Sequence, residues 1–245
     1  MDKTKDVKFK RKDYPPAPHI LDSIEKVSKH FETKRDYIYE FCGMVQASKR
    51  WRVSRRLSDS LKIWKAQFIK DKPNRFEIAD IIEDAFLKCT SDDEIDELRG
   101  GLLEALLIGI KGGGVSSLND YQSYLNRGWG AKVYLTADNH TRGIYYECNK
   151  KETDGCTNRS TVDYGEWDGK LSNFYECKAS PNSISCKEVM YMDFLRSELD
   201  KRDIAHNIHF VSAEAKLSVK LKLDSWGAHS SFIPVGYEDL KEMAN

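Results

Sequence analysis

The stretch Ser160-Thr-Val-Asp-Tyr-Gly-Glu-Trp-Asp-Gly-Lys-Leu-Ser-Asn-Phe-Tyr-Glu-Cys-Lys-Ala-Ser180 decides the fold. Two runs rich in Val, Tyr, Trp and Phe flank an Asp-Gly pair, which is a strong signal for a β-hairpin. Asp163 lies in the first predicted strand, and Glu176 and Lys178 lie in the second. Because side chains alternate between the two faces of a strand, Glu176 and Lys178 share one face. Two carboxylates and a lysine are therefore expected to converge where the strands pair.

A capped helix is predicted before the hairpin. Ser91 precedes three acidic residues, which is typical of a helix start, and the following apolar pattern runs to about Lys111. Three glycines at residues 112–114 are interpreted as a flexible end of this helix, because they lack the Gly-Lys-Ser/Thr ending of a phosphate-binding loop. Residues 131–137 and 143–148 are predicted strands.

A second capped helix and another strand follow the hairpin. Ser185 and Glu188 form a capping-box pattern at the start of a helix that reaches about Arg202. Residues 208–213 are predicted to form a strand. A helix between two strands favours a right-handed crossover to a parallel neighbour.

Within this order of elements, one motif resembles the core of the PD-(D/E)XK nuclease superfamily, which includes many restriction enzymes and DNA-repair nucleases. The motif consists of Asp163, twelve intervening residues and then Glu176-Cys177-Lys178. The resemblance covers about residues 91–215. It implies an α/β fold with a restriction-endonuclease-like αβββαβ core and a mixed sheet, preceded by a helical N-terminal region. It also implies hydrolysis that leaves a 5′-phosphate. Val162 stands where a proline would precede Asp163, at a position that varies in such enzymes.

These residue types suit phosphodiester hydrolysis. The reaction requires an activated water and stabilisation of charge on the phosphoryl and leaving oxygens, and Mg²⁺ held by two carboxylates supplies both, with Mn²⁺ as a substitute. Asp163 and Glu176 are the expected ligands, with the backbone carbonyl of Cys177 completing the site and its thiol on the opposite face. Beside the cation, Lys178 would have a lowered pKa and would either accept a proton from the water or orient it. The alternative is a hairpin that has no catalytic role and in which Glu176 and Lys178 merely form an ion pair at the surface.

Two further acids bear on this site. Many members of the superfamily have a glutamate on the first core helix, and Glu104 is preferred here to Glu97 because the glycines at residues 100–101 would let that helix approach the sheet. A surface position for Glu104 is the alternative. Asp168 is an alternative to Asp163 as a ligand, but it falls in the Asp-Gly turn, where aspartate has an ordinary structural role.

The charge is unevenly distributed. The chain has 39 Lys and Arg and 39 Asp and Glu, but residues 1–75 carry 20 of the former and 10 of the latter. We therefore divide the chain into a basic, helical N-terminal region at residues 1–90 and a nuclease domain at residues 91–245. No apolar run reaches the length of a membrane span, and the N-terminus lacks the apolar core of a secretory signal. A cytoplasmic protein without membrane contact is expected.

The N-terminal third contains the candidate nucleic-acid contacts. Residues 1–18 are charged and then rich in proline, which predicts a flexible or extended leader, and residues 20–49 and 57–68 have helical periodicity. Between the helices, five basic residues surround one tryptophan, a composition suited to phosphate contact and base stacking. The candidates are Lys49, Arg50, Trp51, Arg52, Arg55 and Arg56. The alternative is a solvated helix end with Trp51 packed inward, and the sequence leaves both open.

The six cysteines are interpreted as free thiols. No two of them show Cys-x-x-Cys spacing, and the chain carries no secretion signal. Cys148 and Cys156 with His140 are too loosely spaced to predict a zinc site.

The sequence thus predicts a Mg²⁺-dependent deoxyribonuclease. No zinc finger or other sequence-reading module is present. Two versions are open: a restriction-type endonuclease acting by itself as a homodimer, and the effector nuclease subunit of an antiphage defence or repair complex, loaded or regulated by a partner protein. The alternative from another class is a catalytically inactive nuclease-fold protein that binds nucleic acid or a partner protein.

Overall fold

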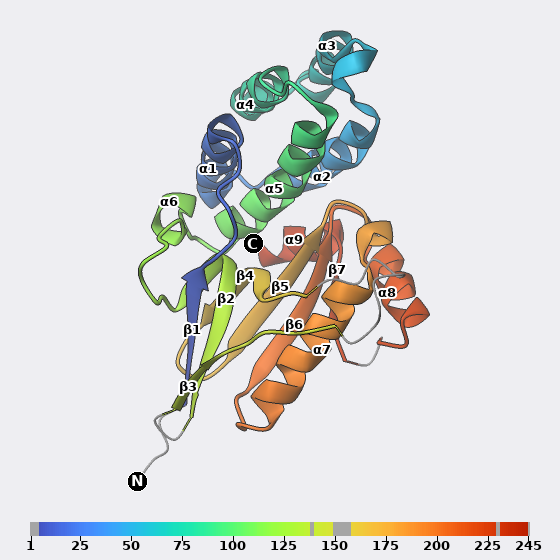
Figure 1. Ribbon diagram of the computed structural model, residues 1–245. Helices are drawn as coiled ribbons and strands as arrows, with labels where there is room; N and C mark the ends of the chain where they lie inside the picture. The colour runs from blue at the N-terminus through green and yellow to red at the C-terminus, as the bar shows by residue number, and fades with distance from the viewer. Residues whose placement is uncertain (1–4, 138–139, 149–157, 229–230, 245) are drawn as a thin grey trace.

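The computed structural model describes residues 5–137, 140–148, 158–228 and 231–244 (Figure 1). In these ranges the centre is an open, mixed sheet of seven strands with the neighbour order β1-β2-β4-β5-β6-β7, and β3 also pairs with β2. The predicted α/β class with a mixed sheet is therefore confirmed. The strands are β1 (Asp6–Arg11), β2 (Arg127–Ala137), β3 (His140–Gly143), β4 (Thr161–Trp167), β5 (Ser172–Lys178), β6 (His206–Ser212) and β7 (Ile233–Val235).

The predicted hairpin is formed by β4 and β5. They pair antiparallel from Trp167 and Ser172 to Tyr164 and Tyr175. In the turn, Oδ1 of Asp168 accepts hydrogen bonds from the backbone N–H groups of the second and third residues after it, at 2.8 and 2.7 Å. Asp168 therefore has the structural role expected of an aspartate in a turn, and its side chain does not approach Asp163.

The helices lie on both sides of the sheet. In Figure 1, α7 and α8 cover one face, whereas α1 to α5 form a bundle beyond one end of the strands. None of the described helices is both long and apolar enough to cross a membrane. The helices are α1 (Pro18–Thr33), α2 (Ile38–Ala47), α3 (Leu57–Phe68), α4 (Phe76–Leu87), α5 (Asp92–Ile110), α6 (Val115–Leu118), α7 (Cys186–Asp200), α8 (Lys216–Ser225) and α9 (Tyr237–Met243).

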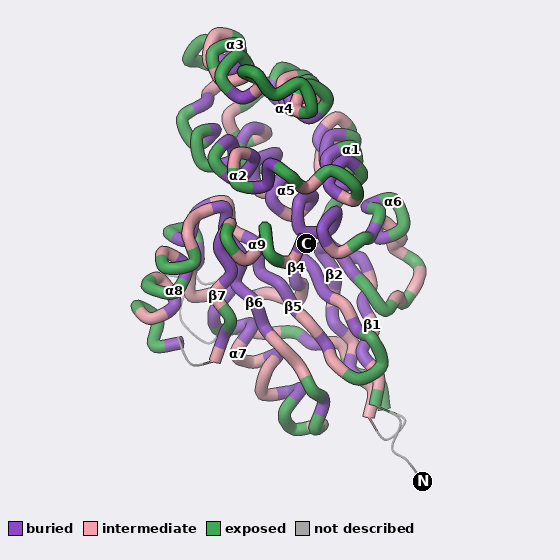
Figure 2. Tube along the Cα trace, turned by 180° about the vertical axis from the view of Figure 1, so that it is seen from behind, coloured by how far each residue is buried: buried purple, intermediate pink, exposed green. Residues whose placement is uncertain are grey.

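The predicted parallel crossover is present. The helix α7 joins β5 to β6, which pair in parallel over their whole length, and β7 extends the parallel part. The capping box that predicted the start of α7 is formed by Ser185 and Glu188. Figure 2 shows that the buried residues are concentrated along the central strands and α5, whereas α3 and α4 combine buried and exposed residues.

The prediction of a leader at residues 1–18 was wrong for Asp6–Arg11. These residues form β1, which pairs antiparallel with β2. Val7 and Phe9 are 0% and 1% exposed, because alternate residues of this strand enter the core. The strand predicted at residues 143–148 is also corrected, since β3 ends at Gly143.

The helix α5 belongs to the helical bundle as much as to the sheet. A Cβ on Gly101 would lie 2.4 Å from Cδ1 of Ile24, and one on Gly109 would lie 2.5 Å from the carbonyl oxygen of Ser28. These glycines let α5 approach α1, which corrects the expectation that the pair at residues 100–101 serves contact with the sheet. One hydrophobic cluster joins the bundle to β4, β5 and β6, so the predicted boundary between residues 90 and 91 does not coincide with a gap in packing.

Candidate active site

The site lies where β4 and β5 separate. Their ladder ends at Tyr164 and Tyr175, and beyond it the backbone N–H of Cys177 donates to Oδ2 of Asp163 at 2.7 Å. The Asp163 side chain therefore replaces a backbone acceptor of β4. Because the N–H and C=O of a strand residue point to the same edge, the Cys177 carbonyl also faces this opening. The Cys177 thiol packs in the cluster shared with the helices, on the face opposite Glu176, as the sequence predicts.

Arg159 brings the two predicted carboxylates together. Its Nη2 donates to Oδ1 of Asp163 at 3.1 Å and to Oε2 of Glu176 at 2.5 Å, so both acids converge on one cationic nitrogen. Its Nη1 donates to Oε1 of Glu188 at 3.3 Å. Burial disfavours the charged guanidinium, but the three acids outweigh burial and raise the pKa of Arg159. Arg159 was not predicted as a site residue, and Glu188 was predicted only as part of a helix cap.

Lys178 completes the group from the same face of β5 as Glu176. Its Nζ lies 2.7 Å from Oε1 of Glu176, 3.6 Å from Oε1 of Glu188 and 4.0 Å from Oδ2 of Asp163. Burial disfavours the ammonium group, but Glu176 and Asp163 outweigh it and raise the pKa of Lys178 above its usual range. Without a bound metal, Lys178 is therefore a cation at neutral pH.

Glu176 is the most deeply buried acid of the group. It is 0% exposed, and burial raises its pKa to about 7 although Arg159 opposes the shift. Its Oε1 lies 2.7 Å from Nζ of Lys178, and its Oε2 accepts the hydrogen bond from Arg159. The predicted ion pair of Glu176 and Lys178 is therefore present, but it is buried and does not lie at the surface.

Glu104 approaches the site from α5. Its Oε2 accepts a hydrogen bond of 2.5 Å from Nε1 of Trp129 on β2. Burial, and then the negative charge of Asp163, raise the pKa of Glu104 to about 8. Glu104 lines the same cleft as Asp163, whereas Glu97 is exposed. The preference for Glu104 over Glu97 therefore agrees with the position of Glu104. The reason for that preference was wrong, because Gly101 packs against α1 and not against the sheet.

A cleft of about 430 Å³ connects these residues to the basic segment. Lys49 and Arg52 line it together with Asp163 and Lys178. Arg52 lies 3.5 Å from a carboxylate oxygen of Asp96, but Lys49 forms no ion pair with any residue that the structure describes. The cleft thus has acids at its base and an unneutralised cation at its rim.

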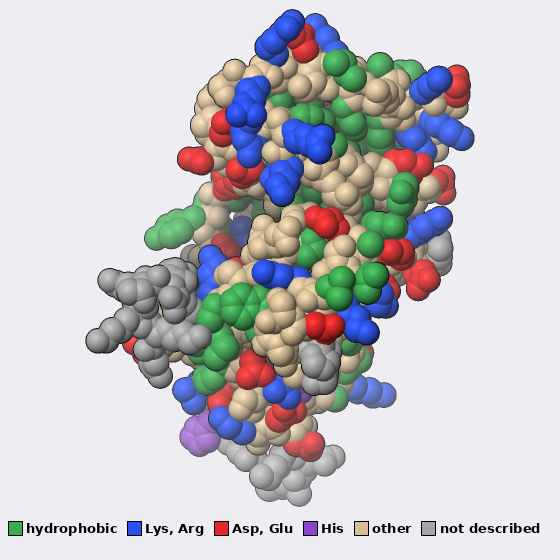
Figure 3. Space-filling view, turned by 90° about the vertical axis from the view of Figure 1, so that its right-hand side faces the viewer, with side chains coloured by type: hydrophobic (Ala, Val, Ile, Leu, Met, Phe, Trp, Pro, Cys, Tyr) green, Lys and Arg blue, Asp and Glu red, His purple; other side chains and the backbone are tan. Residues whose placement is uncertain are grey.

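The rest of the basic segment lies outside this cleft. Trp51 is 6% exposed, and its ring packs edge-on against those of Phe86 and Trp64, with centroids 4.8 and 5.7 Å away. Of the two interpretations left open, the inward-packed tryptophan is therefore the one observed. The prediction that Trp51 stacks on a nucleic-acid base was wrong. Arg50 lines a neighbouring hollow of about 710 Å³, in the helical part whose surface Figure 3 shows with several Lys and Arg side chains.

The remaining candidates are placed as follows. Arg55 and Arg56 are exposed, and Arg56 pairs with Asp59 at 2.7 Å. Cys42, Cys89 and Cys177 are free thiols, as predicted, and Cys156 lies outside the described residues. Within the described ranges, one group of three His, Cys, Asp or Glu side chains has ligand atoms within 4.8 Å of one another: His19, Cys89 and Glu94. Asp163 and Glu176 therefore have no third acid that close.

Comparisons with known proteins add little to this geometry. No protein-family model matches the chain. No curated protein matches it either. Among solved structures, the chain is similar to the crystal structure of protein VC1899 from Vibrio cholerae, with 10% identity and a TM-score of 0.37. The match covers 98% of this chain and 57% of that one, so the chain spans little more than half the length of this neighbour. Similarity at this level assigns neither a fold family nor a function.

Proposed function

We propose that this protein is a metal-dependent nuclease that hydrolyses phosphodiester bonds of DNA. The observation that carries the proposal is the convergence of the Asp163 and Glu176 carboxylates on one cationic nitrogen, beside Lys178. The neighbouring cation Lys49, at the rim of the same cleft, supports a polyanionic substrate.

The topology supports a restriction-endonuclease-like core. The elements α5, β2, β4, β5, α7 and β6 follow one another in the αβββαβ order that the family resemblance implies, apart from the short β3. The four strands are neighbours in the sheet, and only β5 and β6 among them are parallel. The acids lie on β4 and β5, at the centre of this arrangement.

The donor set fits a Mg²⁺ ion. Asp163, Glu176 and the Cys177 carbonyl would hold it, and these oxygen ligands are the kind that Mg²⁺ prefers. The two carboxylates already share one cationic nitrogen of Arg159, which supports a preference of this position for positive charge. When bound, Mg²⁺ would lower the pKa of a water molecule and offset charge on the phosphoryl oxygens.

The remaining residues have separable roles in this proposal. Lys178, 2.7 Å from Glu176 and 4.0 Å from Asp163, would orient the attacking water and offset negative charge. Lys49 and Arg52 contact the substrate backbone at the cleft rim. Glu104, fixed by Trp129, faces the cleft from the opposite side to β5 as a second, more weakly acidic carboxyl.

The test is cleavage of supercoiled plasmid, linear duplex, single-stranded DNA and RNA with Mg²⁺ or Mn²⁺. Wild-type protein is compared with Asp163→Asn and Lys178→Ala, and Asp168→Asn is the matched control because its side chain serves only the turn. We expect activity in the wild type and in Asp168→Asn, and its loss in the other two variants. Equal activity in all four proteins would refute the assignment.

The same assay separates the two versions of the enzyme. Discrete fragments from duplex DNA, produced by the protein alone, support a restriction-type endonuclease. Activity that appears only when a partner protein is added supports an effector subunit of an antiphage or repair complex.

One observation favours a second candidate, a nuclease-fold protein that binds nucleic acid without cleaving it. Arg159 already occupies the position between the two carboxylates, which partly neutralises the acidic cluster without a metal. Calorimetry with Mn²⁺ distinguishes the two. This candidate holds if the wild type binds no Mn²⁺ at the Asp163 site while DNA binding persists and weakens with salt.

A further inference from the structure

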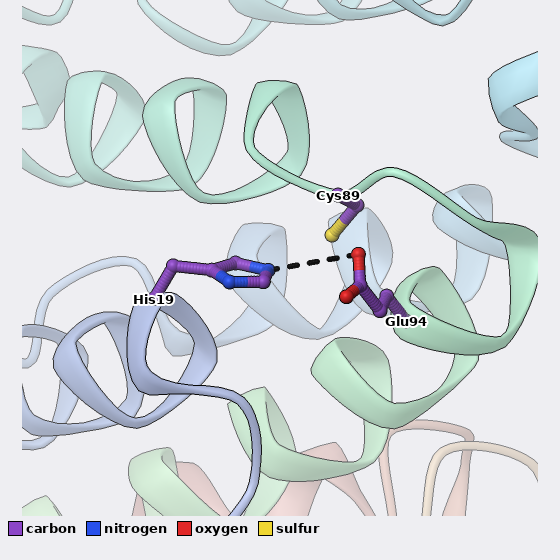
Figure 4. Close-up of side chains that lie close together, drawn as sticks. All are labelled: His19, Cys89 and Glu94. Atoms are coloured by element: carbon purple, nitrogen blue, oxygen red, sulfur yellow. Dashed lines mark ion pairs between the residues drawn. The ribbon is translucent and has the colours of Figure 1, made fainter.

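A second group of metal-ligating side chains lies at the other end of α5. His19 is in the first turn of α1, Cys89 follows α4, and Glu94 is in the first turn of α5 (Figure 4). Glu94 precedes Glu104 by ten residues on this helix, which corresponds to about 15 Å along the axis. The group is therefore separate from the cleft and independent of the proposed nuclease activity.

The side chains point toward one another. Figure 4 shows the imidazole of His19 and the thiol of Cys89 directed at the carboxylate of Glu94. All three ligand atoms lie within 4.8 Å of one another, and Nε2 of His19 is 3.8 Å from Oε2 of Glu94. This Nε2 is buried and has no hydrogen-bond partner among the residues that the structure describes. An unpartnered buried nitrogen facing a thiol and a carboxylate calls for a cation or a proton between them.

The geometry suits a tetrahedral ion. Zinc binds imidazole nitrogen and carboxylate oxygen at about 2.1 Å, so two such ligands at a tetrahedral angle lie about 3.4 Å apart. The observed 3.8 Å between His19 and Glu94 requires only a small side-chain movement. Nitrogen, sulfur and oxygen donors together are typical of zinc, whereas Mg²⁺ prefers oxygen alone.

The role of Glu94 in helix capping leaves it able to bind an ion. Its Oε2 accepts hydrogen bonds from the backbone N–H and the hydroxyl of Thr90, at 2.6 and 3.0 Å. Its Oε1 accepts none from the part of the chain that the structure describes. The oxygen that faces His19 is also Oε2, so an ion at this distance would share that oxygen with the cap, while Oε1 is available as a further donor.

We propose that His19, Cys89 and Glu94 bind one Zn²⁺ ion, with water in the fourth position. The ion joins the start of α1 to the connection between α4 and α5 and the first turn that follows it, two parts of the bundle that are distant in sequence. Burial, and then the charges of Glu94 and Glu97, raise the pKa of the Cys89 thiol to about 11, so zinc binding releases a proton from this sulfur at neutral pH. Because the ion would bind the folded chain, it stabilises the fold.

The test uses metal-free full-length protein titrated with Zn²⁺ in a calorimeter and with Co²⁺ in a spectrophotometer. We expect one site per chain, a thiolate-to-cobalt charge-transfer band, and a rise in Tm with Zn²⁺. Cys89→Ser should abolish the band, and His19→Ala should weaken zinc binding by more than about 100-fold, the upper end of what a changed supporting residue costs. Cys42→Ser, which removes a buried thiol elsewhere in the bundle, is the matched control and should retain the site.

Three outcomes would overturn the proposal. The first is the absence of a site filled by one equivalent of Zn²⁺ in wild-type protein. The second is a charge-transfer band that persists in Cys89→Ser and is lost in Cys148→Ser, which would place the ion elsewhere. The third is zinc affinity that is equal in His19→Ala and in wild type, with circular dichroism showing both to be folded.

Discussion

Glu176 should make the metal-free protein less stable as the pH rises. Its carboxyl is 0% exposed and has a pKa of about 7, against about 4.5 when unfolded. A folded-state pKa above the unfolded value means that the folded protein holds the proton more tightly. The resulting stability is fully present below about pH 4.5 and is lost as the pH rises through about 7. Linkage then gives a loss of about 2–3 kcal/mol between about pH 5 and pH 8.5.

The perturbation that isolates this effect is Glu176→Gln, which cannot titrate. We expect urea denaturation in the presence of EDTA to show that the unfolding free energy of the wild type falls, relative to the variant, by about 2–3 kcal/mol over that range. Glu97→Gln, at an exposed position of α5, is the control and should track the wild type. The reasoning is refuted if the difference between wild type and Glu176→Gln changes by less than about 0.5 kcal/mol.

Three further predictions concern packing and the basic segment. Gly109→Ala should lower the unfolding free energy by about 1–3 kcal/mol, because the new Cβ would lie 2.5 Å from a backbone oxygen. Gly100→Ala places its Cβ where no atom lies within 4 Å, so it should raise the unfolding free energy by about 0.5–1 kcal/mol in the same urea denaturation assay. Trp51→Ala should cost about 3–5 kcal/mol if Trp51 is a core residue, and a change below about 1 kcal/mol would contradict its burial. Lys49→Ala should reduce the slope of log K against log salt for DNA binding by about 1, while Arg55→Ala, outside the cleft, should leave it unchanged.

Elements with strong local signals could be predicted from the sequence. The Asp-Gly turn with its aromatic flanks predicted β4 and β5, and the serine caps predicted the starts of α5 and α7. The strand β1 was missed because only Val7 and Phe9 carry its alternation, within a segment that is otherwise charged. Its pairing with β2 is a contact between residues more than a hundred positions apart, which no local pattern encodes.

The site was predicted only as far as one hairpin can position side chains. Asp163, Glu176 and Lys178 are brought together by strand pairing, which the sequence period indicates. Arg159 lies two residues before β4 and Glu188 lies on α7, so their places in the site depend on tertiary packing. The direction of Trp51 likewise depends on where α3 and α4 lie, because these helices supply the rings that cover it.

The measurement that tests the central claim most directly is the rate of plasmid cleavage in Mg²⁺ by wild-type protein and by Asp163→Asn, prepared in parallel. This substitution keeps the size of the side chain but removes its charge at the opening between β4 and β5. The proposed metal site predicts cleavage by the wild type that EDTA stops, and a loss of about 100-fold or more in the variant. Cleavage at the same rate by both proteins, or by neither, would contradict it.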